Sequence, residues 1–167
     1  MIQAALSIAI AYYVLYVLDY FTSWQCLQRP IVVAPVAGLI LGDFRTGIIM
    51  GASLESIFMG ISAIGGSIPA DAMSSSIIAV AYTILTGASA EEGLAIAMPI
   101  GTALASFRTL IMAAIASPLA PHWEKLAVTN IRKFNVETIV VFLSLPLILT
   151  AVLFISVAYG VEGLNNL

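Results

Sequence analysis

Long apolar segments without charges limit the fold of this chain more than any other feature. The segment Thr138–Tyr159 contains no charged residue, and neither does Met1–Leu18. Leu94–Ser117 contains a single one, Arg108. A membrane-spanning helix needs about 20 predominantly apolar residues. The sequence therefore predicts an all-α integral membrane protein with several transmembrane helices.

The composition supports lipid as the solvent. Hydrophobic residues make up 61% of the 167-residue chain and charged residues 9%, against about 25% charged in ordinary soluble domains. The mean hydropathy is +1.08. So few charges cannot cover a soluble surface, and residues 1–167 are expected to form a single membrane domain.

Several functions are not supported by the residues present. The chain has no basic patch, so we expect no nucleic acid among its partners. With one cysteine and one histidine, it lacks the ligands of a cysteine-rich metal site. It also lacks a Walker loop, a dinucleotide fingerprint and a nucleophile elbow. We expect no cofactor and no enzymatic activity of its own.

Three apolar segments in the first half are too short to span a membrane as straight helices: Pro30–Leu41, Thr46–Gly60 and Met73–Thr86. Irregular backbone at membrane depth must be buried in protein or line a polar cavity. Transporters build mid-membrane substrate sites from such discontinuous helices. We therefore expect short, broken or re-entrant helices here, and the functional site among them.

Glu55 is the first candidate site residue, because it interrupts one of these apolar segments. An acidic side chain facing lipid costs about 2.5–3.5 kcal/mol on insertion scales for aspartate, so Glu55 must face protein, water or a ligand. Ser53 is close enough in sequence to share a ligand cavity with it. The alternative is a structural ion pair or a hydrogen bond between helices.

Asp71 is the second candidate, at the end of a segment rich in glycine and proline. Such residues break a helix and free backbone donors and acceptors, which suits a ligand with many hydroxyl groups. The alternative is that Asp71 caps the following helix. The candidate ligand-binding residues of this segment are Gly65, Gly66, Ser67, Pro69 and Asp71.

The remaining polar residues favour structural roles. Asp43 and Arg45 suggest a turn between helices with a local charge pair, and Arg108 is expected to snorkel or to pair with an acid. The stretch Pro118–Glu137 is the only extended polar one, and its basic residues favour the cytoplasmic side. His122 is expected to be a solvated loop residue in this stretch.

The run from Arg29 to Glu55, RPIVVAPVAGLILGDFRTGIIMGASLE, resembles the enzyme IIC membrane subunit of the mannose/sorbose-type sugar phosphotransferase systems of bacteria. The sequence is similar to the IIC components for mannose, sorbose and N-acetylgalactosamine in that family. The segment Gly65–Asp71 fits the glycine-rich, Pro-Asp segment of that family. The resemblance is strongest over residues 28–101.

The resemblance implies a subunit that moves a hexose or amino-hexose across the bacterial inner membrane. A IID-type membrane subunit would be its partner, in an oligomer, and cytoplasmic IIA and IIB subunits would carry out the phosphoryl transfer. Glu55 and the Gly65–Asp71 segment would lie at the sugar site.

Two departures from the family leave alternatives open. Gly51, Ala52 and Ser53 stand where a pair of glycines is usual, and the family usually continues for further hydrophobic segments. The C-terminal part of the family fold is therefore expected to be missing. The alternative functions are a shortened, non-transporting membrane scaffold or a proton-coupled secondary transporter.

Overall fold

The computed structural model describes residues 2–22, 26–61, 69–160 and 163, and these ranges contain helices and no strand. The all-α prediction is confirmed. The elements in chain order are α1 (Ile2–Thr22), α2 (Pro30–Leu41), α3 (Phe44–Phe58), α4 (Ala72–Thr86), α5 (Ala90–Thr129), α6 (Ile131–Ile155) and the π-helix η1 (Ser156–Gly160).

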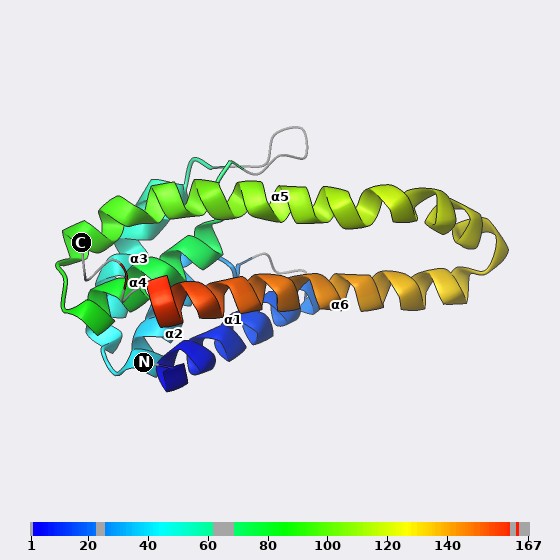
Figure 1. Ribbon diagram of the computed structural model, residues 1–167. Helices are drawn as coiled ribbons and strands as arrows, with labels where there is room; N and C mark the ends of the chain where they lie inside the picture. The colour runs from blue at the N-terminus through cyan, green and yellow to red at the C-terminus, as the bar shows by residue number, and fades with distance from the viewer. Residues whose placement is uncertain (1, 23–25, 62–68, 161–162, 164–167) are drawn as a thin grey trace.

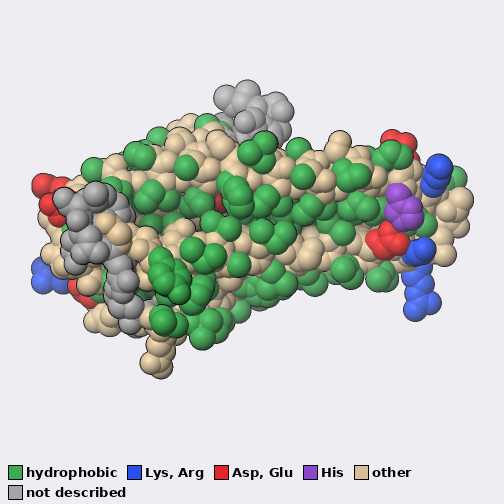
Figure 2. All heavy atoms as spheres, viewed as in Figure 1, with side chains coloured by type: hydrophobic (Ala, Val, Ile, Leu, Met, Phe, Trp, Pro, Cys, Tyr) green, Lys and Arg blue, Asp and Glu red, His purple; other side chains and the backbone are tan. Residues whose placement is uncertain are grey.

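Within the described ranges, three helical stretches are long and apolar enough to cross a membrane: α1, α5, and α6 together with η1. They contain the three long segments expected from the sequence, apart from Met1, which lies outside the described residues. In Figure 1, α5 and α6 run side by side along the length of the molecule, while α1 to α4 gather around one half of it. Charged side chains collect at the two ends of the face in Figure 2, and the length between them is mostly uncharged.

The helices α2 and α3 form a tight hairpin. Gly42 ends α2 with a φ of 86°, a left-handed conformation that favours glycine. Asp43 then caps α3, accepting hydrogen bonds from the Thr46 amide at 3.0 Å and the Thr46 hydroxyl at 2.6 Å. These bonds hold the pKa of Asp43 below its usual range. The predicted turn is confirmed, but the partner of Asp43 is Thr46 and not Arg45.

Two glycines bring α2 and α3 into backbone contact. A Cβ on Gly38 would lie 2.8 Å from the Cα of Gly47, and one on Gly47 would lie 2.7 Å from the Ala34 carbonyl oxygen. Small residues at such crossings let two helices approach closely within a membrane. This packing fixes the direction in which α3 leaves the hairpin, and so the position of Glu55 near its end.

The helix α4 occupies the centre of the fold. Every residue from Met73 to Ala81 is buried, and α4 packs against α5, α2 and α3. A short helix surrounded in this way does not face lipid along this stretch. Its start, at Asp71, therefore lies inside the protein, as expected for a broken helix.

The polar stretch Pro118–Glu137 is helical, and the expectation of a loop around His122 is wrong. The helix α5 continues through Pro118 to Thr129, and α6 begins at Ile131. The side chain of Asn130 caps α6 by accepting from the Lys133 amide at 3.1 Å. His122 lies on α5, with its Nε2 2.9 Å from Glu137 Oε2 on α6. Glutamate, lysine, leucine and alanine between Pro121 and Thr129 are good helix formers, which explains why the helix continues.

Candidate functional site

A polar cavity of about 160 Å³ lies where the broken helices meet the middle of α5. Its walls come from the segment before α2, the end of α3, the start of α4, and α5. Charged groups of both signs reach it from separate parts of the chain. The lining residues are Gln28, Arg29, Phe58, Ile61, Ala70, Asp71, Ala72, Met73 and Arg108.

Glu55 contacts this wall through Arg29. Its Oε1 accepts from the Arg29 Nε at 2.8 Å and also from the Arg29 Nη2, while its Oε2 accepts from the Ile31 amide at 3.2 Å. The Glu55 side chain is 15% exposed and that of Arg29 is 40% exposed. Both carboxylate oxygens thus hold the start of α2, and Arg29 is the member of the pair that lines the cavity.

Asp71 lines the cavity directly and also caps α4. Only 5% of it is exposed. Its Oδ1 accepts from the Ser74 amide at 3.1 Å and its Oδ2 from the Ser74 hydroxyl at 3.2 Å. Its own amide donates to the Gly101 carbonyl on α5 at 2.9 Å. The capping role that the sequence suggested is confirmed, and the carboxylate keeps acceptor capacity beyond these two bonds.

Asp19 orders the other side of the cavity, and sequence reasoning did not single it out. It is 4% exposed near the end of α1. Its Oδ1 accepts from the Leu27 amide at 2.8 Å and its Oδ2 from the Gln28 side-chain amide at 3.0 Å. These bonds fix the segment that carries Gln28 and Arg29 into the wall. A carboxylate among apolar residues at the end of the first hydrophobic segment was the available signal.

Arg108 lines the cavity, although the sequence did not assign it to the site. It was expected to snorkel or to pair with an acid. Within the described ranges, no carboxylate oxygen lies within 4.0 Å of its nitrogens. Its Nη2 donates instead to the Tyr16 hydroxyl at 3.0 Å, and its Cζ lies 5.6 Å from the centroid of the Tyr16 ring.

Two other predicted site residues, Ser53 and Pro69, are not brought into the cavity wall. Ser53 is half-buried on α3 and donates to the Ile49 carbonyl, and Pro69 is exposed just before α4. Neither is among the lining residues. Gly65, Gly66 and Ser67 lie outside the described residues. Their assignment to the site stays a prediction.

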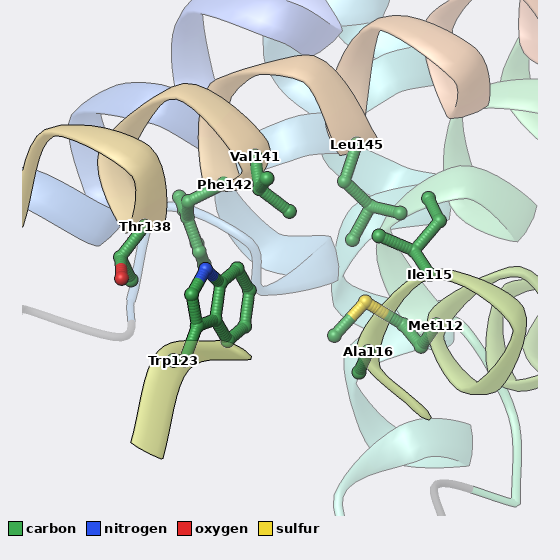
Figure 3. A pocket seen from close by; sticks show the side chains of 8 residues that line it. All are labelled: Met112, Ile115, Ala116, Trp123, Thr138, Val141, Phe142 and Leu145. Carbon is green, nitrogen blue, oxygen red and sulfur yellow. The ribbon is translucent and has the colours of Figure 1, made fainter. Parts of the chain in front are cut away.

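A second cavity, of about 140 Å³, lies between α5 and α6. Figure 3 shows the Trp123 indole of α5 facing the α6 side chains Thr138 and Phe142 across it. The indole Nε1 is buried with no hydrogen-bond partner among the residues described. Most of the lining is aliphatic or aromatic, which does not suit a ligand with many hydroxyl groups. The first cavity is therefore the candidate site.

Comparison with known proteins decides the class of this protein. A family model described as the PTS (phosphotransferase system) sorbose-specific IIC component matches residues 1–167. The chain belongs to this IIC family. The predicted family is confirmed, and members of this family are inner-membrane proteins of the PTS.

Individual relatives cover part of this IIC chain. A putative N-acetylgalactosamine permease IIC component 2 of Escherichia coli K12 is 34% identical over 87 residues, which are 52% of this chain and 65% of the relative. The mannose-specific EIIC component of the same strain is 38% identical over 76 residues, 46% of this chain and 29% of the relative. The matched segments thus span less than two thirds of these relatives.

A solved structure shows the same fold as this IIC chain. It is the cryo-EM structure of the mannose transporter ManYZ in complex with microcin E492. The TM-score is 0.75 at 25% sequence identity, and the match covers 99% of this chain and 68% of that chain.

Proposed function

We propose that this IIC subunit binds a hexose or amino-hexose in the cavity lined by Asp71, Arg29 and Arg108, and passes it inward for phosphorylation by a IIB subunit. One observation carries the proposal: in a protein dominated by apolar helices, charged and amide side chains converge on a single cavity where short helices begin and end. Transporters place substrates at such points.

The chemistry of the lining suits a sugar. Each sugar hydroxyl both donates and accepts a hydrogen bond, so a sugar site needs both kinds of partner. Asp71 supplies acceptors, the guanidinium groups of Arg29 and Arg108 supply donors, and the Gln28 amide supplies both. Phe58 adds an apolar surface to the same wall.

Glu55 belongs to this site through Arg29. Its two oxygens engage the Arg29 guanidinium and the Ile31 amide, so it orients a lining residue while its charge balances that of the guanidinium. Gly65, Gly66 and Ser67 stay candidate contacts of the sugar in this proposal, whereas Ser53 and Pro69 lie outside the cavity wall.

The partners follow from the family and from the broken backbone. IIC components work with other PTS subunits. We expect a IID-type membrane subunit in a stable oligomer, because irregular backbone inside a membrane must be covered by protein. By the same family resemblance, cytoplasmic IIA and IIB subunits would carry the phosphoryl group.

The test is sugar binding by the assembled membrane complex. The chain is co-expressed with a IID-type subunit and purified in mild detergent. Calorimetric titrations with mannose, sorbose and N-acetylgalactosamine follow. We expect saturable binding of at least one sugar. A well-assembled complex that binds no hexose or amino-hexose would support the scaffold alternative, and sugar uptake driven by a proton gradient without IIB would support the secondary transporter.

A further inference from the structure

We infer that Arg108 is a specificity-determining residue of the sugar cavity, which contacts the sugar directly and is positioned by Tyr16. The inference rests on the proposed function, because it assigns one side of the same cavity. Neither residue was among the site residues expected from the sequence.

The cost of placing Arg108 where it lies is the first argument. It sits within α5, one of the candidate membrane spans, where an arginine facing lipid is expensive and ionisable residues mark substrate pathways. It is half-buried and reaches the polar cavity. A charged side chain in this position is accounted for if a ligand uses it.

The hydrogen-bonding capacity of Arg108 is the second argument. A guanidinium has five N–H donors and no acceptor. Among the described residues, Arg108 uses one of them on the Tyr16 hydroxyl, and no carboxylate there lies within 4.0 Å of it. Arg29, by contrast, directs both its Nε and its Nη2 to Glu55. Arg108 is thus the donor with more capacity left for a ligand.

Asp71 complements Arg108 within the same cavity. It comes from the start of α4, and its two oxygens each accept one bond from Ser74. Both residues line the cavity, yet they do not form an ion pair within 4.0 Å. Opposite charges held apart in this way present donors on one side and acceptors on the other, and a sugar hydroxyl pair satisfies both.

Tyr16 holds Arg108 in this position. Tyr16 is 3% exposed, and its ring packs between Tyr12 and Phe142, with centroid distances of 6.0 Å and 6.3 Å. Its hydroxyl therefore offers a fixed acceptor to the guanidinium, and its ring face adds a cation–π contact. Tyr16 is a positioning residue, because it acts on the sugar through Arg108.

The experiment combines protein variants with altered sugars. The sugar bound by the complex with a IID-type subunit is compared with its monodeoxy analogues, by titration calorimetry, in the wild type, Arg108→Gln and Tyr16→Phe. Arg132→Gln is the matched control, because Arg132 is an exposed arginine at the start of α6 and does not line the cavity.

We expect Arg108→Gln to weaken binding of the parent sugar by about tenfold to a hundredfold. One deoxy analogue lacks the hydroxyl that Arg108 contacts. It should bind the wild type more weakly than the parent sugar does, whereas Arg108→Gln should bind the analogue and the parent sugar with equal affinity. Tyr16→Phe should weaken binding of the parent sugar less than Arg108→Gln does. It should also reduce the affinity difference between the parent sugar and that deoxy analogue. Arg132→Gln should match the wild type throughout.

The outcomes separate this inference from the proposed function. Absence of sugar binding by the assembled wild-type complex defeats the proposed function itself. The inference alone fails if the wild-type complex binds sugar and each monodeoxy analogue loses as much affinity, relative to the parent sugar, in Arg108→Gln as in the wild type. If Arg108→Gln does not assemble, Arg108→Lys provides the same test, because lysine keeps the charge but loses the planar fork of donors. An unchanged profile in that variant would likewise overturn the inference.

Discussion

The carboxylate of Glu55, near the end of α3, binds the guanidinium of Arg29 just before α2, 26 residues earlier in the chain. The same carboxylate accepts the Ile31 amide at the start of α2. One acidic side chain therefore stabilises a helix start and orients a cavity residue at once. Its effect on sugar binding is expected to pass through Arg29.

Replacing Glu55 with glutamine tests that path. Glu55→Gln keeps the size but removes the charge that balances Arg29, so we expect sugar binding by the complex to weaken by about tenfold to a hundredfold. Assembly should persist, because a neutral amide is easier to bury than a carboxylate. Calorimetry and size-exclusion chromatography of the same sample measure both. Glu91→Gln, at an exposed position in the first turn of α5, is the control. Unaltered sugar affinity would remove Glu55 from the site.

Two substitutions of Asp71 distinguish its role as the cap of α4 from its proposed role in sugar binding. Asn ranks with Asp as a helix cap, whereas Ala in place of either costs about 1 kcal/mol. Asp71→Asn should therefore keep the thermal stability of the complex but weaken sugar binding, and Asp71→Ala should lower both. Melting curves with and without sugar distinguish the two effects. Wild-type affinity in Asp71→Asn would mean that Asp71 serves only as the cap of α4.

The contact between α2 and α3 predicts a strong effect of a single methyl group. A Cβ on Gly38 would lie 2.7 Å from the Asp43 carbonyl oxygen and 2.8 Å from the Gly47 Cα. Because both are backbone atoms, Gly38→Ala should destabilise the protein by about 1–3 kcal/mol. Gly60→Ala is the control, since a Cβ at that position would meet no atom of the described residues within 4 Å. Equal melting temperatures for the two variants would contradict this packing.

Asp19 predicts a local effect on the connection between α1 and α2. Asp19→Ala leaves the Leu27 amide and the Gln28 side chain without their acceptor, and a buried donor without a partner costs about 1–3 kcal/mol. We expect faster hydrogen exchange at the Leu27 amide and weaker sugar binding, with Asp19→Asn intermediate. Exchange as slow as in the wild type would show that Asp19 does not order this segment.

The membrane spans and the broken helices were predictable from local sequence. Length and the absence of charge define Thr138–Tyr159 as a span, because lipid imposes both. Gly42 ends α2 because glycine readily adopts the left-handed backbone conformation at that position. The continuation of α5 beyond Pro118 was not predicted, because proline and polar residues together are typical of a loop.

The side-chain partners were not predictable in the same way. Arg108 and Tyr16 are 92 residues apart, and their contact depends on how α1 and α5 each pack against α6. The sequence showed that Glu55 needs a partner inside the membrane but not that Arg29 supplies it. Polar partners on different helices have no fixed separation in the sequence, so only the packed structure identifies them.

The helix α5 contacts the cavity region at two points along its length, Gly101 and Arg108. Gly101, whose carbonyl accepts the Asp71 amide, precedes Arg108 by two turns, about 10 Å along the helix axis at 1.5 Å per residue. One helix therefore binds the backbone of Asp71, which supplies acceptors to the cavity, and also carries Arg108, which supplies donors. Sliding or tilting of α5 against α4 would change the distance between Asp71 and Arg108. A partner that binds the distal half of α5 and moves the helix would therefore change the geometry of the proposed sugar site.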